Sequence, residues 1–133
     1  MTDERRETAK RVTRGIVAIA MVSVGVLHFT QADAFAQIVP PLLPAPMWLV
    51  WISGVFEILG GISVLVPRVR SLAGWGLVLL YVCVYPANVY MAVVPIAVNG
   101  VVPPRWVVWA RLPFQPLFMW VAWWCTRPPR QTA

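Results

Sequence analysis

Charged residues are scarce in this chain. Only five of its 133 residues are acidic, and charged residues of both signs make up 12%, against about 25% in ordinary soluble domains. Hydrophobic residues reach 59% and the mean hydropathy is +0.71. This composition excludes an ordinary soluble globular domain. It predicts an integral membrane protein that forms one domain over residues 1–133.

The residue types required for many common chemistries are also few. The chain has one histidine and two cysteines, Cys83 and Cys125, and neither cysteine belongs to a C-x-x-C pair. Intrinsic dithiol chemistry therefore has little support. One histidine beside one glutamate is a poor metal set, so we predict no metal and no intrinsic cofactor. No phosphate loop, Ser-His-Asp pattern or nucleic-acid motif occurs, and nucleic acid is not an expected partner despite the net charge of +6.

Four apolar runs have the length of about 17 to 25 residues that a membrane-spanning helix needs. They cover residues 12–30, 47–66, 71–94 and 105–125, and proline, glycine and asparagine gather between them. A backbone in lipid must satisfy its own hydrogen bonds, and β-alternation is absent, so each run is predicted to be a helix. The predicted fold is all-α, an integral membrane four-helix bundle.

Lysine and arginine predict the orientation of this bundle. Five of them precede the first run, two join the second run to the third, and two follow the fourth. The two other connections together contain only Arg105. Because basic residues favour the cytoplasmic side, both termini are predicted to be cytoplasmic. The eight tryptophans fall near the predicted interfaces, which agrees with this frame.

The N-terminus also admits a second interpretation. Basic residues, an apolar core at residues 16–27 and the sequence Ala-Asp-Ala from residue 32 resemble a secretory signal with its cleavage site. Three acidic residues in the basic region, and polar residues ahead of the cleavage site, argue against it. We therefore treat the segment as a span. Cleavage would leave three.

Six polar side chains are predicted to converge in the outer half of the membrane, away from the termini. They are His28, Glu57, Tyr85, Asn88, Arg111 and Gln115. A charge inside a span is expected to face the protein interior and find a partner, so Glu57 and Arg111 are predicted to meet, as an ion pair or around a ligand. At 1.5 Å per residue, Glu57 lies about 15 Å from its outer helix end, whereas His28 lies close to the surface.

Small residues and prolines accompany this polar set. Gly25, Gly54 and Gly61 are predicted to let helices approach closely. Prolines at positions 86, 113 and 116 remove backbone donors inside the third and fourth runs, and freed carbonyls beside polar groups are common where a cavity or ligand site lies.

Each polar residue also has a structural interpretation. The two charges may be written as a buried pair that fixes the helix arrangement. His28 is more typical of a hydrogen-bonded structural histidine than of a metal ligand. Asn88 is placed to bridge the backbone broken by Pro86, and Tyr81 and Tyr85 are typical packing aromatics.

The connection at residues 31–46 is too apolar for a free loop. Its large apolar side chains are Phe35, Ile38, Val39, Leu42 and Leu43. Such a segment is expected to lie in the outer membrane interface, as a lid over the polar set.

Five short motifs resemble the DoxX family of small four-helix membrane proteins. In order they are GVLHF from Gly25, IVPPLLP from Ile38, SGVFEILGG from Ser53, YPANVYM from Tyr85 and RLPFQ from Arg111. The resemblance extends over residues 15–124. It implies an association with oxidoreductase systems, including quinone-coupled sulfur oxidation and thiol stress, in a bacterial-type cytoplasmic (inner) membrane. Relatives with a cysteine pair carry out redox work that this chain cannot copy.

Two functional hypotheses follow. In the first, the protein is an accessory membrane subunit without autonomous turnover that binds a quinone-like or other small amphipathic ligand through the six polar residues, beside an oxidoreductase or sulfurtransferase-like partner. A carboxylate near an imidazole keeps acid–base catalysis open as well. In the second, the polar set locks the helices together and the protein is a structural or assembly scaffold. The glycine spacing also suits a homo-oligomer.

Overall fold

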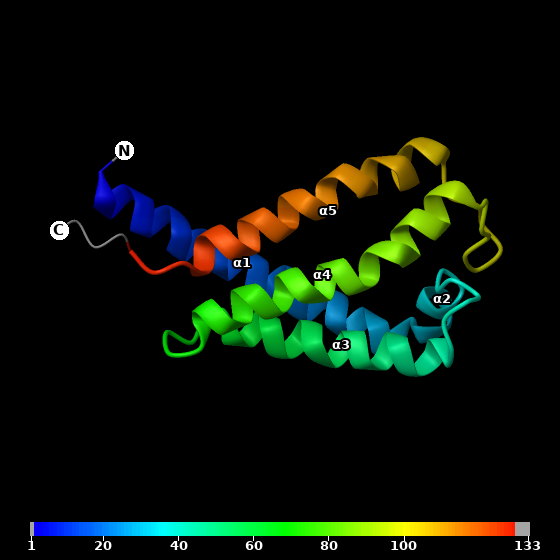
Figure 1. Ribbon diagram of the computed structural model, residues 1–133, viewed down its shortest axis with the longest axis horizontal. Helices are drawn as coiled ribbons and strands as arrows, with labels where there is room; N and C mark the ends of the chain where they lie inside the picture. The colour runs from blue at the N-terminus through cyan, green and yellow to red at the C-terminus, as the bar shows by residue number, and fades with distance from the viewer. Residues whose placement is uncertain (1, 130–133) are drawn as a thin grey trace.

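The computed structural model describes residues 2–129, and over this range the protein is built from helices (Figure 1). The five helices are α1 (Asp3–Thr30), α2 (Ala32–Ala36), α3 (Pro46–Ser63), α4 (Arg70–Val93) and α5 (Arg105–Thr126). A single antiparallel bridge between Val98 and Val101 interrupts the loop between α4 and α5. The predicted all-α class is confirmed.

Three of these helices have the length and apolar composition needed to cross a membrane. They are α1, α3 and α4, which contain the first three predicted spans almost residue for residue. Helix α5 matches the fourth predicted span in its bounds and has 22 residues. Its five tryptophans, two prolines, Arg111 and Gln115 lower its hydropathy, so composition alone does not place α5 with the other three.

Helix α1 begins nine residues before the predicted span. Thr2 caps it, because the Thr2 hydroxyl oxygen accepts a hydrogen bond from the Arg5 backbone N–H at 3.4 Å. Asp3 and Glu4 lie in its first turn, where negative charge favours a helix. The basic N-terminal segment is therefore a helical extension of the span.

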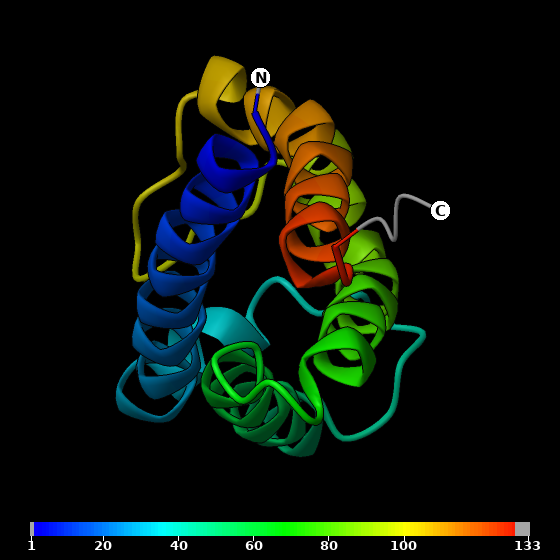
Figure 2. The same ribbon diagram turned by 90° about the vertical axis from the view of Figure 1, so that its left-hand side faces the viewer.

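The four long helices form a ring in which each contacts two neighbours. Helix α1 packs mainly on α3, and α4 mainly on α5, while α3–α4 and α1–α5 contacts join the two pairs (Figures 1 and 2). Among the described residues, no such contact joins the diagonal partners α1 and α4, or α3 and α5, at the level of the Cα atoms. This order decides which polar side chains are able to meet.

The predicted close approach at Gly25, Gly54 and Gly61 is confirmed between α1 and α3. A Cβ atom on Gly25 would lie 2.6 Å from Ile58 Cγ1 and 2.9 Å from the Gly54 carbonyl oxygen. A Cβ atom on Gly61 would lie 3.0 Å from Met21 Cβ. The two backbones are therefore as near to each other as small residues allow.

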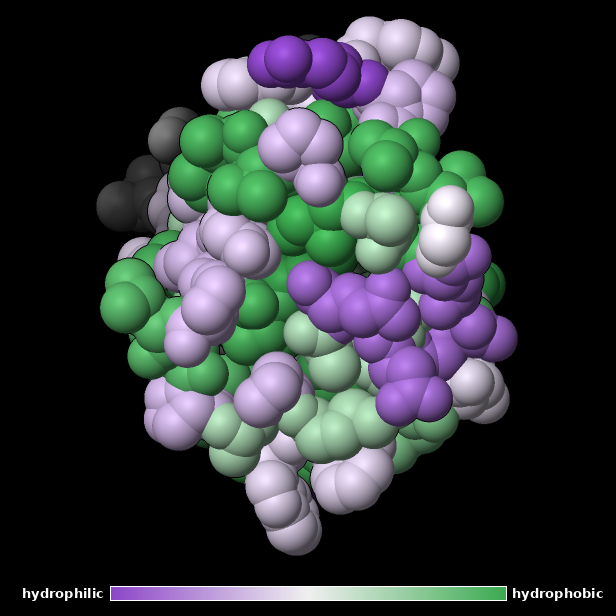
Figure 3. Space-filling view, turned by 90° about the vertical axis from the view of Figure 1, so that its right-hand side faces the viewer, coloured by the Kyte–Doolittle hydropathy of each residue, from purple (hydrophilic) through white to green (hydrophobic). Residues whose placement is uncertain are grey.

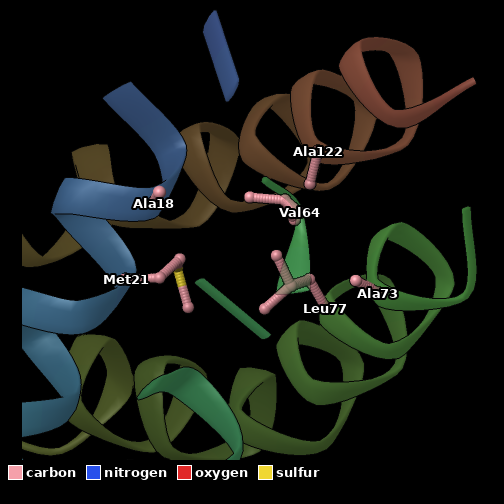
Figure 4. Close-up of a cluster of buried hydrophobic side chains, with 6 residues drawn as sticks. All are labelled: Ala18, Met21, Val64, Ala73, Leu77 and Ala122. Carbon is pink, nitrogen blue, oxygen red and sulfur yellow. The ribbon is translucent and has the colours of Figure 1, made fainter. Parts of the chain in front are cut away.

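The apolar core lies toward the end of the ring that holds both chain termini. Six buried residues from all four long helices and the α3–α4 turn form it, as Figure 4 shows: Ala18, Met21, Val64, Ala73, Leu77 and Ala122. Many other large apolar side chains remain exposed on all four long helices. Exposed apolar surface of this extent indicates a lipid bilayer as the surroundings of the helices.

The two ends of the molecule differ. What we call the terminal end carries the start of α1, the end of α5 and the turn at residues 64–69 (Figure 1). The opposite end carries α2 and the loop at residues 94–104, and it shows apolar side chains with separate polar patches (Figure 3). The segment at residues 31–46 is thus not wholly a loop, because α2 forms in it and packs on α3 and α1.

Candidate functional site

His28 and Glu57 form a buried pair between α1 and α3. His28 Nδ1 lies 2.9 Å from Glu57 Oε2, and the two residues are only 7% and 5% exposed. The same Nδ1 lies 2.9 Å from the Val24 carbonyl oxygen. A carbonyl oxygen can only accept, so this contact requires the proton of the ring on Nδ1. His28 Nε2 is then the ring nitrogen that is free to accept or donate.

One oxygen of Glu57 is enclosed and lacks an aligned donor. Oε2 is a buried side-chain atom without a hydrogen-bond partner among the described residues, although His28 Nδ1 is within ion-pair distance. The two observations agree if the single Nδ1 hydrogen points at Val24 and so cannot point at Glu57 as well. A buried acceptor left in this state is costly, at about 1 to 3 kcal/mol. It is the atom in this molecule best placed to receive a hydrogen bond from a bound group.

The glycines and α2 explain why this pair is buried. Gly54 lies directly beside His28, since a Cβ atom on it would be 2.8 Å from His28 Cβ. Phe35 of α2 stacks on the His28 ring with a centroid distance of 4.0 Å and an interplanar angle of 18°. The prediction that His28 lies close to the surface is therefore wrong, because α2 folds over the end of α1 and covers the imidazole. The expected role of residues 31–46 as a cover is met at Phe35.

A second polar group links α4 to α5. Asn88 Nδ2 donates to Gln115 Oε1, and Gln115 Nε2 donates to the Tyr81 carbonyl oxygen at 2.5 Å. Gln115 is 5% exposed. The backbone of α4 is thus supported near the point where Pro86 removes a donor, but by Gln115 rather than directly by Asn88.

Tyr81 extends this second group across the ring. Its hydroxyl donates to the Met21 sulfur at 2.9 Å, which links α4 to the diagonal helix α1. Met21 itself packs against Gly61, one turn along α3 from Glu57. The sequence pattern treated Tyr81 only as a packing aromatic. Its position four residues before Tyr85 on one helix face was the available signal.

Arg111 does not pair with Glu57. Its side chain is exposed, and its Nη1 reaches only the Met91 sulfur of α4, at 3.6 Å. The two ion pairs found among residues 2–129 are Lys10–Glu7 and His28–Glu57. The predicted direct ion pair is wrong because Glu57 on α3 and Arg111 on α5 belong to diagonal helices of the ring.

Near Arg111, the protein leaves a small apolar cavity at the opposite end of α4 and α5. The cavity measures about 190 Å³, and Met91, Val108 and Arg105 are among its lining residues. Met91 therefore separates this cavity from the Arg111 guanidinium. Tyr85 lies elsewhere, in an open apolar groove on the surface of α4 with Pro86 and Val89.

The six predicted residues are thus distributed over the ring. The structure joins His28 to Glu57 and Asn88 to Gln115, while Arg111 and Tyr85 contact neither pair in the described residues. No group of three or more histidine, cysteine or acidic side chains suited to a metal ion occurs within residues 2–129. The arrangement supplies hydrogen-bond acceptors and donors at mid-depth, beside apolar walls.

Comparison with known proteins gives one match. Residues 17–126 match a domain family of unknown function, DUF8561. No curated protein and no solved structure matches the chain. The match covers most of the chain, so the protein belongs to the DUF8561 family.

Proposed function

We propose that this member of the DUF8561 family is a multi-pass membrane protein that binds the polar headgroup of a small amphipathic molecule, of the quinone type, and serves as an accessory subunit of an oxidoreductase system. The observation that carries the proposal is the enclosed Glu57 Oε2, which has no aligned donor although it lies beside an imidazole. A bound hydroxyl or hydroquinone O–H satisfies this oxygen. Binding then recovers the free energy lost to the unsatisfied acceptor.

The membrane arrangement is part of this proposal. In it, α5 crosses the bilayer together with α1, α3 and α4, because it packs along the whole of α4 and has a comparable length. The terminal end is cytoplasmic, since it carries most of the basic residues, and the membrane is the cytoplasmic (inner) membrane of a bacterial-type cell. The His28–Glu57 pair then lies in the outer half of the bilayer.

The chemistry of the His28–Glu57 pair suits a quinone headgroup in both redox states. Glu57 accepts from a hydroquinone hydroxyl, and His28 Nε2 donates to a quinone carbonyl oxygen when the ring is protonated. Only the ring of such a ligand needs to enter the protein, because its apolar tail stays in lipid. Arg111, exposed on α5, provides a further donor for a headgroup approaching between the helix pairs.

The experiment is a titration of the purified protein with a short-chain benzoquinone, followed by quenching of its tryptophan fluorescence. We expect saturable quenching in the wild type and at least tenfold weaker binding in Glu57→Gln, which equals about 1.4 kcal/mol. Asp33→Asn makes the same change at an exposed carboxylate and is the matched control. Quenching that does not saturate, or a Glu57→Gln affinity equal to that of Asp33→Asn, contradicts the proposal.

A scaffold function is the second candidate, and one observation favours it. The amide of Gln115 is occupied on both sides, by Asn88 and by the Tyr81 carbonyl, as expected of a network that only locks helices. Under this function, neutralising both members of the buried pair in His28→Gln with Glu57→Gln preserves folding better than either single change, since a single change strands a buried polar group. Equal loss of melting temperature in all three variants counts against it.

The protein partner is inferred from the DoxX resemblance. An oxidoreductase or sulfurtransferase-like subunit beside this chain explains why a ligand site occurs without a cysteine pair or a metal set of its own. Chemical cross-linking in native membranes, followed by mass spectrometry, tests this. Recovery of cross-links only between copies of this chain would instead indicate a homo-oligomer.

A further inference from the structure

Four basic side chains gather at the terminal end, outside the His28–Glu57 pair. Lys10 and Arg14 come from α1, Arg70 begins α4, and Arg127 follows α5. Figure 2 views this end, where the start of α1, the turn between α3 and α4, and the end of α5 come together. Lys10 and Arg14 are only 4% and 6% exposed, which is unusual for such residues.

Three of these cations hold the C-terminal ends of neighbouring helices. Arg14 Nη1 donates to the Cys125 carbonyl oxygen at 2.8 Å, and Lys10 Nζ donates to the Arg127 carbonyl oxygen at 3.0 Å. Arg70 Nε donates to the Val64 carbonyl oxygen, just after α3, at 3.2 Å. Each bond satisfies a carbonyl that the helix leaves without a partner. These contacts explain why the side chains turn inward.

Helix carbonyls do not neutralise this much positive charge. The C-terminus of a helix is equivalent to about half a negative charge, and each guanidinium carries a full positive one. Within residues 2–129, Glu7 is the acidic residue that pairs here, and it lies 3.6 Å from Lys10. Arg14 and Arg70 have no carboxylate within ion-pair distance in the described part of the chain, and their charges act on each other. The terminal end therefore has an excess of positive charge.

The arginines also retain unused donors. A guanidinium has five N–H groups, and Arg14 and Arg70 each use one nitrogen on a carbonyl. The other guanidinium nitrogens are not enclosed without partners, because Glu57 Oε2 is the atom in that state within the described residues. They are accessible from the surface. Forked donors of this kind match the oxygens of a phosphate.

Aromatic residues position the fourth cation at the depth of lipid headgroups. The Arg127 guanidinium lies 4.9 Å from the ring centroid of Trp75 and 4.5 Å from that of Trp123. Helices α4 and α5 approach closely enough for this because Gly74 faces Thr126, where a Cβ atom would overlap the threonine hydroxyl. Tryptophan favours the membrane interface, so Trp75 and Trp123 indicate that Arg127 lies at headgroup level.

We propose that Arg14, Arg70 and Arg127 bind the phosphate of an anionic phospholipid headgroup at the terminal end of the protein. A lipid is favoured over a soluble anion because the cations lie at the rim of an apolar, tryptophan-lined helix surface, where the acyl chains of the same molecule are buried. The site is independent of the proposed quinone-type ligand, from which it is separated by the apolar core.

Native mass spectrometry of the detergent-purified protein tests the site. Phosphatidylglycerol and phosphatidylcholine with the same acyl chains are added in parallel, and the retained adducts are counted after detergent removal in the gas phase. We expect the wild type to retain phosphatidylglycerol at least threefold better than phosphatidylcholine. Arg70→Gln should lose this preference, whereas Arg68→Gln, an exposed arginine two residues away in the same turn, should keep it.

Thermal unfolding supplies the second measurement and identifies the source of the phosphate. Phosphatidylglycerol should raise the melting temperature of the wild type and not that of Arg70→Gln, even if the variant starts from a lower value. Inorganic phosphate at millimolar concentration should have little effect. Equal retention of both lipids, equal loss in Arg68→Gln and Arg70→Gln, or equal stabilisation by inorganic phosphate each overturns the assignment.

Discussion

The side-chain nitrogen of Gln115 on α5 lies 2.5 Å from the main-chain oxygen of Tyr81 on α4 and donates a hydrogen bond to it. Gln115 also accepts from Asn88, one turn beyond Pro86 on the same helix. One buried amide therefore supports a helix on both sides of the proline that interrupts its hydrogen bonding. This relationship makes Gln115 the residue that holds α4 to α5 in the middle of the ring.

Replacing Gln115 with leucine should destabilise the protein. The substitution leaves the Asn88 amide and the Tyr81 carbonyl without their partner, which costs about 1 to 3 kcal/mol for a buried polar group. Thermal unfolding in detergent measures the effect. Gln31→Leu, the same change at an exposed position, is the control and should leave the melting temperature nearly unchanged. Equal melting temperatures for the two variants would show that the Gln115 contacts contribute nothing to stability.

Alanine at Gly25 should loosen the contact between α1 and α3. Its Cβ atom would lie 2.6 Å from Ile58 Cγ1 and 2.9 Å from the Gly54 carbonyl, so the helices must move apart, at a cost of about 1 to 3 kcal/mol. Gly76→Ala is the matched control, since no atom lies within 4 Å of the new Cβ. It should stabilise the helix by about 0.5 to 1 kcal/mol. Unfolding curves showing the opposite order would contradict the packing described.

Phe35→Ala should expose the imidazole of His28. Phe35 stacks on that ring, and the chain has a single histidine, so any histidine modification reports on His28 alone. We expect the rate of modification by diethyl pyrocarbonate, followed at 240 nm, to rise several-fold in the variant. Phe29→Ala removes an exposed aromatic from the last turns of α1 and should leave the rate unchanged. A Phe35→Ala rate equal to that of wild type would mean that something other than α2 covers His28.

Cys83 offers a test of the membrane environment. It is exposed on the surface of α4, near the middle of the helix, whereas Cys125 is buried. If lipid surrounds α4, a membrane-impermeant maleimide should not modify Cys83 in intact membranes and should modify it after solubilisation in dodecyl sulfate. Rapid modification in intact membranes would place this face of α4 in water and remove the membrane frame on which the proposals depend.

Introduced cysteines test the orientation. In a chain whose natural cysteines are replaced by alanine, Asn99→Cys should react with an impermeant maleimide in intact cells, because the α4–α5 loop is predicted to be outside. Arg68→Cys, in the turn between α3 and α4, should react only after the cells are opened. The reverse pattern would place the termini outside and invert the frame.

Much of the fold was predictable because it depends on local composition. The apolar runs located α1, α3 and α4 to within a few residues, apart from the charged extension at the start of α1. The close approach at Gly25, Gly54 and Gly61 was predictable too, because the lack of a side chain acts in the same way wherever helices meet in lipid. The burial of Lys10 and Arg14 was not, since their carbonyl partners are more than a hundred residues away in the chain.

Hydropathy and residue spacing established that Glu57 must face the protein interior and find a partner there, because an isolated carboxylate is not tolerated in an apolar span. They did not establish which residue that partner is. The order of the helices around the ring chose His28, since α1 is a neighbour of α3, and excluded Arg111, since α5 lies diagonally across from α3. Neighbour relations of this kind depend on the packing of whole helices, and no local pattern of residues encodes them.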